Sequence, residues 1–264
     1  MGRVIVITSG KGGVGKTTTS ANVGTALAML GKKVVLVDTD IGLRNLDVVL
    51  GLENRIVYDL VDAVRGNCRL KQALIKDKRL ETLFLLPAAQ TKDKTAVTTD
   101  QMLELCTKLK EEFDYVIIDC PAGIEHGFKN AIAGADEAIV VTTPEVSAVR
   151  DADRIIGLLE AAGIAEPRLI INRIRTNMVK SGDMMGVEDI LEILAVDLQG
   201  VVPDDDAIVI STNKGEPTVF DEHSRPGQAF RNIARRINGE QVPLMDLEEK
   251  RSLFGRLMHM FKSE

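Results

Sequence analysis

A glycine-rich stretch with two lysines lies close to the start of the chain, at residues 10–17. It reads Gly-Lys-Gly-Gly-Val-Gly-Lys-Thr and matches G-x-x-x-x-G-K-[ST], a pattern typical of loops that bind nucleotide phosphates. The glycines let successive backbone N–H groups turn toward one anion, and a following helix adds the partial positive charge of its N-terminus. Lys16 would contact the β- and γ-phosphates, and the Thr17 hydroxyl would complete the coordination of Mg²⁺. The predicted phosphate-binding residues are Gly10, Lys11, Gly12, Gly13, Val14, Gly15, Lys16, Thr17 and Thr18.

Acidic residues that nucleotide chemistry could use stand at the ends of apolar runs. Residues 115–119 read Tyr-Val-Ile-Ile-Asp, the pattern of a buried strand ending in a carboxylate that holds Mg²⁺ through water, here Asp119. Asp38 and Asp40 follow another apolar run, at residues 34–37. Capping of a loop or helix is the alternative role for these two carboxylates.

These side chains need a scaffold that brings the ends of several strands together. Short apolar runs without polar alternation recur along the chain, as is typical of strands covered on both faces. They lie at residues 4–7, 34–37, 83–86, 116–118, 139–141, 169–171 and 201–202. Segments with helical spacing lie between them, among them residues 18–30, 100–112, 146–162 and 187–194. This alternation predicts an α/β fold: a doubly wound, mostly parallel sheet with helices on both faces and a ligand site at the carboxyl ends of the strands.

The composition fits one large globular domain. The chain has 264 residues, of which 45% are apolar, enough to bury a core. Its formal charge of −6 argues against a body coated in positive charge, so no specific nucleic-acid partner is expected. The apolar run at residues 4–7 belongs to the fold, so no targeting signal is expected at the front. No stretch approaches the roughly 20 apolar residues that span a bilayer.

The three cysteines, Cys68, Cys106 and Cys120, are odd in number and widely spaced. This usage suits a reducing compartment better than a disulfide framework, and it predicts a cytoplasmic protein. We expect all three thiols to lie in or near the core.

A second lysine, Lys11, lies inside the glycine-rich loop and gives it a deviant Walker A form. In this form the chain resembles the ParA/MinD family of P-loop ATPases. The resemblance implies that Lys11 reaches across an ATP-sandwiched homodimer to the phosphates of the partner. It also implies that residues 38–47 are switch I, in which Asp40 orients the attacking water beside the magnesium ion. Residues 119–125 would be switch II, in which Gly123 donates a backbone N–H toward the γ-phosphate.

The same resemblance assigns recognition of the base to the ends of two later strands. The positions that match the adenine-contacting elements of the family are Asn172, Arg173, Pro203 and Asp204. ATP is therefore the expected nucleotide, since the stretch that starts at Asn172 does not read as the guanine motif Asn-Lys-x-Asp. The alternative is that Asn172 caps a strand and that Asp204 starts a helix.

Several further segments resemble the MinD, or septum-site-determining, branch of that family, and the resemblance covers nearly the whole chain. These segments are residues 40–47, 74–79, 85–91, 121–125 and 145–154. The resemblance implies a Mg²⁺-dependent ATP hydrolase that positions the division inhibitor MinC, and so the septum, with MinE or another topological regulator. It places Asp151 and Asp153 near the partner surface, whereas the residues alone would predict a solvated helical face. A MinD-like flagellar-number regulator and a ParA-type DNA-segregation ATPase are the alternative functions.

The end of the chain differs in character from the body. After the predicted ATPase domain, residues 1–238, a polar break at residues 239–249 predicts a linker, and residues 250–264 form a basic amphipathic segment. At about 100° per residue, apolar side chains gather on one arc of this segment and most of its cations on the other. The predicted membrane-facing residues are Leu253, Phe254, Leu257, Met258 and Phe261. This pattern is typical of a helix that lies on an anionic membrane surface, although a helix docked on the body would share it.

Estimates of binding free energy indicate how the nucleotide state would control membrane binding by this segment. One segment of this length is too short to be a stable helix in water, and ordering entropy offsets most of its gain from burial. Two segments on one ATP-bound dimer gain about 10²- to 10⁴-fold in avidity. We therefore expect a peripheral protein that cycles between the cytoplasm and the inner face of the membrane with its nucleotide state.

Overall fold

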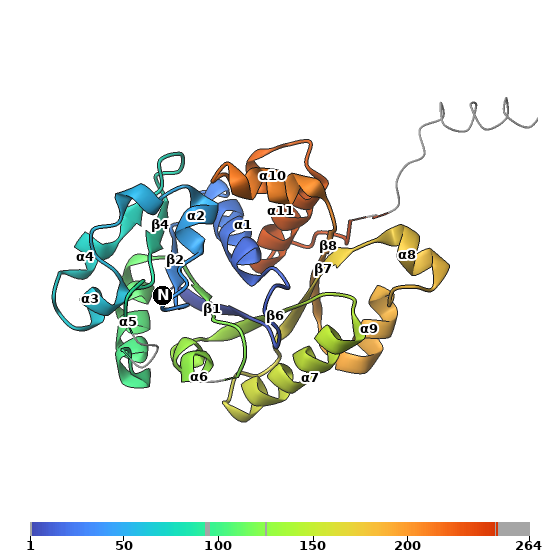
Figure 1. The fold of residues 1–264 in the computed structure, drawn as a ribbon, viewed down its shortest axis with the longest axis horizontal. Helices are drawn as coiled ribbons and strands as arrows, with labels where there is room; N and C mark the ends of the chain where they lie inside the picture. Colours follow the sequence, from blue (N-terminus) through green and yellow to red (C-terminus); the bar gives the residue numbers. More distant parts are fainter. Residues whose placement is uncertain (1, 93–95, 125, 246, 248–264) are drawn as a thin grey trace, which may run out of the picture.

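The computed structural model describes residues 2–92, 96–124, 126–245 and 247. These residues fold around one mixed β-sheet. Within these residues the sheet has eight strands in the order β3-β4-β2-β5-β1-β6-β7-β8, and β3 alone is antiparallel to its neighbour (Figure 1). The strands are β1 (Arg3–Thr8), β2 (Val34–Asp38), β3 (Ile75–Lys76), β4 (Leu83–Leu86), β5 (Tyr115–Asp119), β6 (Glu137–Thr142), β7 (Arg168–Ile174) and β8 (Leu198–Pro203). The predicted fold class is confirmed, and every apolar run predicted as a strand is one.

The sequence pattern did not predict β3, because this strand has no apolar run of its own. It consists of two residues, of which Ile75 is buried and Lys76 is exposed. It sits at the edge of the sheet beside β4, where a short strand with an outward lysine limits pairing with other chains.

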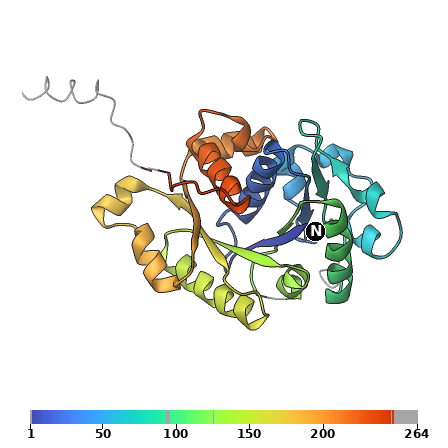
Figure 2. The same ribbon diagram turned by 180° about the vertical axis from the view of Figure 1, so that it is seen from behind.

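Helices cover both faces of the sheet, as Figures 1 and 2 show from opposite sides. One face carries α1 (Lys16–Met29), α2 (Leu46–Leu50), α10 (Asp206–Asn213) and α11 (Arg225–Ile237). The other carries α3 (Leu60–Val64), α4 (Leu70–Ala73), α5 (Thr99–Glu112), α6 (His126–Ile132), α7 (Val146–Ala161) and α9 (Val187–Leu194). The remaining short elements are α8 (Thr176–Ser181), η1 (Glu53–Arg55) and η2 (Thr218–Phe220). The helices predicted from spacing correspond to α1, α5, α7 and α9.

Alternation along the strands divides the apolar core into two layers. In β1, Val4 and Val6 pack with the layer under α5, α6 and α7, whereas Ile5 and Ile7 pack with the layer under α1 and α11. All four side chains are at most 1% exposed. Since both faces are covered, the strand is apolar at every one of these positions, which explains the unbroken run in the sequence.

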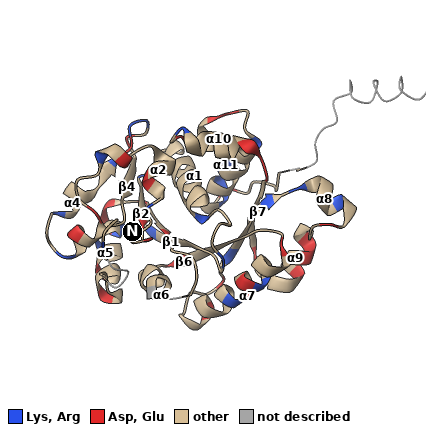
Figure 3. Ribbon diagram, viewed as in Figure 1, with Lys and Arg blue, Asp and Glu red and all other residues tan. Residues whose placement is uncertain are grey.

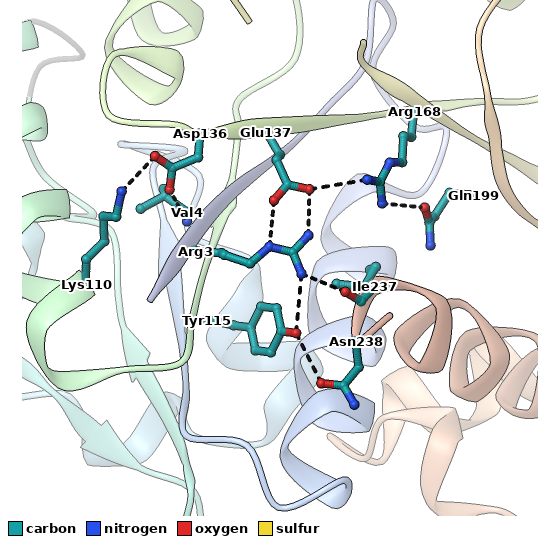
Figure 4. A network of polar contacts seen from close by, with 10 residues as sticks. All are labelled: Arg3, Val4, Lys110, Tyr115, Asp136, Glu137, Arg168, Gln199, Ile237 and Asn238. Atoms are coloured by element: carbon teal, nitrogen blue, oxygen red, sulfur yellow. Dashed lines mark hydrogen bonds and ion pairs between the residues drawn. The ribbon is translucent and has the colours of Figure 1, made fainter. Parts of the chain in front are cut away.

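A polar network ties the amino ends of the strands together, at the edge opposite the glycine-rich loop (Figure 4). Arg3 of β1 forms a bidentate pair with Glu137 of β6, with nitrogen–oxygen distances of 2.6 and 2.7 Å. Its Nη1 donates to the carbonyl of Ile237, the last residue of α11, at 2.7 Å. Arg168 of β7 also lies 3.8 Å from the Glu137 carboxylate. This network fixes the end of α11 to the centre of the sheet.

The chain after α11 turns back along that helix. Near the end of α11, Arg236 donates to the carbonyls of Val242 and Pro243, each at 2.7 Å. At its first residue, Arg225 donates to the carbonyl of Leu247, also at 2.7 Å. The predicted domain boundary at residue 238 follows the last residue of α11 by one position, and the division of the chain stays a prediction. The predicted membrane-facing residues at 253–261 lie outside the described residues.

Basic and acidic residues are both spread over the described body (Figure 3). Acidic residues exceed basic ones in the whole chain, 39 against 33. Of the helices that the structure describes, none has the length and apolar character needed to cross a bilayer.

The three cysteines differ in their access to solvent. Cys106 and Cys120 are 2% exposed, and burial raises the pKa of each thiol to about 12. Cys68 is half-buried, and its pKa is raised by burial and by the nearby Asp62 carboxylate. The expectation of core or near-core thiols is confirmed: Cys106 and Cys120 lie in the core, and Cys68 packs against it while remaining partly exposed.

Maleimide labelling near neutral pH is expected to modify one of the three free cysteines quickly in the native protein, and all three after unfolding in guanidinium. The reason is access: the pKa is raised for all three thiols, but Cys106 and Cys120 are also covered, whereas Cys68 is partly exposed. Mass spectrometry counts the labels. A Cys68→Ser protein should show no fast label, and rapid labelling of that protein would contradict the assignment.

Candidate nucleotide-binding site

The glycine-rich loop connects β1 to α1, and its glycines have backbone angles that other residues rarely adopt. Gly13 has φ of 81°, and Gly15, the N-cap of α1, has φ of 99°. Both values lie in the left-handed region, which is open to glycine at little steric cost. Because the loop ends on the N-terminus of a 14-residue helix, unpaired N–H groups and the helix dipole converge there. The loop therefore has the backbone geometry expected of the predicted phosphate-binding loop.

The two lysines of the loop are placed differently. Lys16, the first residue of α1, is 8% exposed, so its amine is held within the site. Lys11 is exposed, and its Nζ donates to the Oγ of Ser147 in the first turn of α7 at 3.2 Å. The loop also leans on α7 at Gly10, where a Cβ would collide with the backbone of Asp151. Lys16 is therefore buried within the site, whereas Lys11 lies on the outer surface of the loop.

Two buried carboxylates face each other across neighbouring strands. Asp38 of β2 and Asp119 of β5 are register partners and are 1% and 2% exposed. The backbone N–H groups of Asp40 and Leu46 donate to the Asp38 carboxylate at 2.9 and 3.2 Å. Ser20, one turn after the loop lysine in α1, donates its hydroxyl to Asp119 at 2.9 Å. The pairing of β2 with β5 and the contact with α1 together hold both carboxylates next to the glycine-rich loop.

Burial raises the pKa of both acids. The pKa of Asp38 rises to about 8, because the site is buried and because the Asp119 charge lies beside it. The pKa of Asp119 rises to about 6 through burial, opposed by hydrogen bonds from Thr17 and Ser20 and by the charge of Lys16. Both shifts favour the protonated form, so in the absence of a cation this pair binds a proton more readily than free carboxyl groups do. A cation bound beside them would displace that proton.

The donor set at the loop fits Mg²⁺ that arrives with a nucleotide. Among the described residues, no group of three or more histidine, cysteine or acidic side chains can hold a metal ion by itself. The loop instead offers the hydroxyl of Thr17, hydrogen-bonded to the buried carboxylate of Asp119. Mg²⁺ typically binds through one or two such oxygens together with phosphate oxygens and water.

The two predicted switch segments border this site. After β2, the half-buried Asp40 begins a turn in which Gly42 donates its N–H to the carbonyl of Ala89 at 2.9 Å. Arg44 in the same turn has φ of 39°, and its Nε lies 2.9 Å from the buried carboxylate of Asp47. After β5, Gly123 has φ of 91° and open space where a Cβ would be. Both loops start at the carboxyl ends of strands, next to the glycine-rich loop.

A cavity of about 890 Å³ extends the site toward β7 and β8. Its lining includes Gly15 and Thr18 beside the predicted base residues Asn172, Arg173 and Asp204. The fourth predicted base residue, Pro203, is the buried last residue of β8. The Asp204 carboxylate is already paired with Arg175 Nε at 2.6 Å on the rim.

Comparison with known proteins decides the family. A family model described as an AAA domain matches residues 2–166. The septum site-determining protein MinD of Bacillus subtilis (strain 168) is 66% identical over 252 residues, which cover 95% of this chain and 94% of that protein. The chain belongs to the MinD family.

Solved structures of MinD proteins share the fold closely. The MinC:MinD cell division protein complex of Aquifex aeolicus matches with a TM-score of 0.87 and 50% identity, covering 92% of this chain and 99% of that chain. MinD of Pyrococcus horikoshii complexed with Mg-ADP matches with a TM-score of 0.82 and 34% identity, covering 90% of this chain and 96% of that chain. The predicted resemblance to the MinD branch is confirmed, and with it membership of an ATPase family.

The helix α7 borders the loop and carries the two predicted partner-surface residues. Asp151 is half-buried next to Gly10, and Asp153, two residues on, is exposed. The sequence reasoning missed Ser147 and Ser20, which hold Lys11 and Asp119. Helical spacing was the available signal for Ser20, because it lies four residues after Lys16 on α1. No local signal pointed to Ser147.

Proposed function

We propose that this chain is a Mg²⁺-dependent ATP hydrolase whose ATP-bound form is a homodimer. The observation that carries the proposal is the pair of lysines in one phosphate-binding loop. Lys16 is enclosed beside Asp119, where it would contact the phosphates of its own nucleotide. Lys11 is exposed on Ser147 and free to turn toward a second copy of the chain.

Each further residue has a role that its position supports. Thr17 and Asp119 would hold Mg²⁺, which neutralises charge on the phosphates when bound. Asp40, at the start of the switch I turn, would orient the attacking water and belongs to the magnesium site. The N–H of Gly123 would donate to the γ-phosphate from a loop whose φ of 91° is suited to glycine.

The base would enter the cavity between the loop and α8. Its lining mixes methionines with polar and charged residues, a combination typical of small-molecule sites. The proposed adenine-contacting residues are Asn172, Arg173, Pro203 and Asp204.

The surfaces for other partners follow from the family. The relative from Aquifex aeolicus is a MinC:MinD complex, and we propose that this chain also binds the division inhibitor MinC, through a surface that includes Asp151 and Asp153. MinE or another topological regulator would control the cycle. The outcome would be septum placement.

The anchor would be the amphipathic segment at residues 250–264, joined to the ATPase domain, residues 1–238, by the linker at 239–249. Its apolar arc would enter an anionic membrane surface and its cations would face the headgroups. ATP binding would form the dimer, and two segments together would hold the membrane. Hydrolysis would release both, so the protein would be peripheral and cycle with the cytoplasm.

Sedimentation with anionic vesicles tests the proposal. The full chain is expected to sediment with Mg-ATP at least about tenfold more than with Mg-ADP, and a chain ending at Leu247 should stay in the supernatant. Phe261→Glu should abolish sedimentation and leave ATP binding intact. His259→Glu is the matched control, because it adds the same charge on the opposite arc and should keep most of the binding. Sedimentation that ignores the nucleotide, or that survives loss of the segment, would contradict the switch.

A further inference from the structure

An irregularity in β7 aims one side chain at the phosphate-binding loop. The pairing of β7 with β8 runs from Ile171 with Val201 to Ile174 with Pro203, so β7 holds one extra residue between these pairs. Within this bulge Arg173 has φ of 58°, a value that is uncommon outside glycine. Bulges of this kind re-aim a neighbouring side chain, here Asn172.

The amide of Asn172 is buried and bonded at both ends. The residue is 2% exposed. Its Nδ2 donates to the carbonyl of Val14 in the glycine-rich loop at 2.8 Å, and its Oδ1 accepts the backbone N–H of Arg173 at 3.0 Å. The Oδ1 atom of the amide is therefore bonded within the bulge, and the Nδ2 atom is bonded to the loop.

The loop is shaped to receive this amide. A Cβ at Gly15 would collide with the Asn172 Nδ2, so only glycine allows the approach. The carbonyl of Val14 precedes the N-cap of α1 and lies outside the hydrogen-bond ladder of the helix. A side chain from far along the chain thus holds the loop at the point where it enters α1.

We propose that Asn172 is a positioning residue for the phosphate site: its amide braces the carbonyl of Val14 and so holds the loop in its anion-binding form. Because Asn172 also lines the base cavity, it links the two halves of the nucleotide site. The proposal deepens the proposed function and rests on nucleotide binding there. It predicts that loss of the amide weakens binding of the phosphates themselves, and not only of the base.

A probe without a base separates these two effects. We would measure binding of Mg-ATP and of Mg-tripolyphosphate, the latter by displacement of a fluorescent ATP analogue. Asn172→Ala is expected to weaken both by about tenfold, because the loop is no longer pre-organised. Asn172→Ser, which is polar but too short to reach the loop carbonyl, should lose the same factor for both probes.

Asn130 supplies the matched control. It is 5% exposed, and its Nδ2 donates to the carbonyl of Val97 at 2.7 Å, away from the loop. Asn130→Ala should lower the melting temperature as much as Asn172→Ala, yet bind both probes as the wild type does.

Three results would overturn the proposal. A loss for ATP alone would make Asn172 a reader of the base. Unchanged binding of both probes would show that the loop needs no brace, and an equal loss in Asn130→Ala would show a global effect. A wild-type chain that fails to bind Mg-ATP would instead overturn the proposed function itself, which keeps the two failures distinct.

Discussion

An equimolar mixture of Lys11→Ala and Asp40→Ala proteins is expected to hydrolyse ATP at about a quarter of the wild-type rate, although each variant alone should fall at least about 100-fold. The expectation comes from the exposed position of Lys11, whose amine rests on Ser147 and not on its own loop. In a symmetric dimer this lysine would complete the site of the partner, whereas Asp40 would act within its own subunit.

The expected fraction follows from the composition of the mixture. About half of the dimers would contain one chain of each kind. In such a dimer the Lys11→Ala chain keeps its own Asp40 and receives Lys11 from the other chain, so one of its two sites is intact. The second site lacks both groups and stays inactive. Phosphate release at saturating Mg-ATP measures the recovery.

A double variant on one chain provides the control. Lys11→Ala mixed with the Lys11→Ala, Asp40→Ala protein contains no Lys11, so no activity should return. If the mixture of single variants also stayed inactive while both proteins still bound ATP, Lys11 would act within its own subunit. The exposed position of Lys11 would then no longer support an ATP-bound dimer.

The parts of this molecule that the sequence could predict are those with strong local patterns. The inner positions of the central strands are apolar in succession because both faces are covered, so β1 and β5 stand out as runs. The glycine-rich loop has backbone angles at Gly13 and Gly15 that other residues rarely adopt, so its glycines are visible in the sequence. Once parallel strands are inferred, the acids that end them must share one edge of the sheet.

The remaining parts depend on contacts between distant segments. The hydrogen bond from Asn172 to Val14 joins residues 158 positions apart. It depends on the bulge in β7, for which the sequence contains no glycine or proline as a signal. Lys11 and Ser147 are joined across 136 positions. The pairing of Asp38 with Asp119 is a matter of register, which the two runs alone do not determine. These three contacts are determined by the packing of the whole fold and not by local sequence.

Asp119→Asn is expected to make the protein free of metal and nucleotide more stable while nearly abolishing its activity. At pH 8 in EDTA, we expect the free energy of unfolding to rise by about 3 kcal/mol, or about 6–12 °C in melting temperature. The amide has the shape of the carboxyl group and can bond with Ser20 and Thr17, but it needs no charge in the buried site. Without a negative ligand for Mg²⁺, kcat should fall about 100- to 1,000-fold.

The sign of the pH dependence follows from the raised pKa. Asp119 ionises near 3.8 in the unfolded chain and near 6 when folded, so the wild type loses stability as pH rises through that interval. The gain from Asp119→Asn should therefore vanish near pH 4, reach about half at pH 5 and level off above about pH 6. Asp38 adds to the gain, because its pKa falls once the neighbouring charge is gone.

Asp77 is the matched control for this second prediction, since it is 4% exposed but paired with Arg79 at 3.1 Å. Asp77→Asn removes a compensated charge, so it should lower stability where Asp119→Asn raises it. If both variants destabilised the protein alike, the Asp119 carboxylate would be compensated by its hydrogen bonds, and the site would store no strain. Opposite signs would instead show that the buried charge of Asp119 costs stability in the free protein, as expected of an acid that a magnesium–nucleotide complex would neutralise on binding.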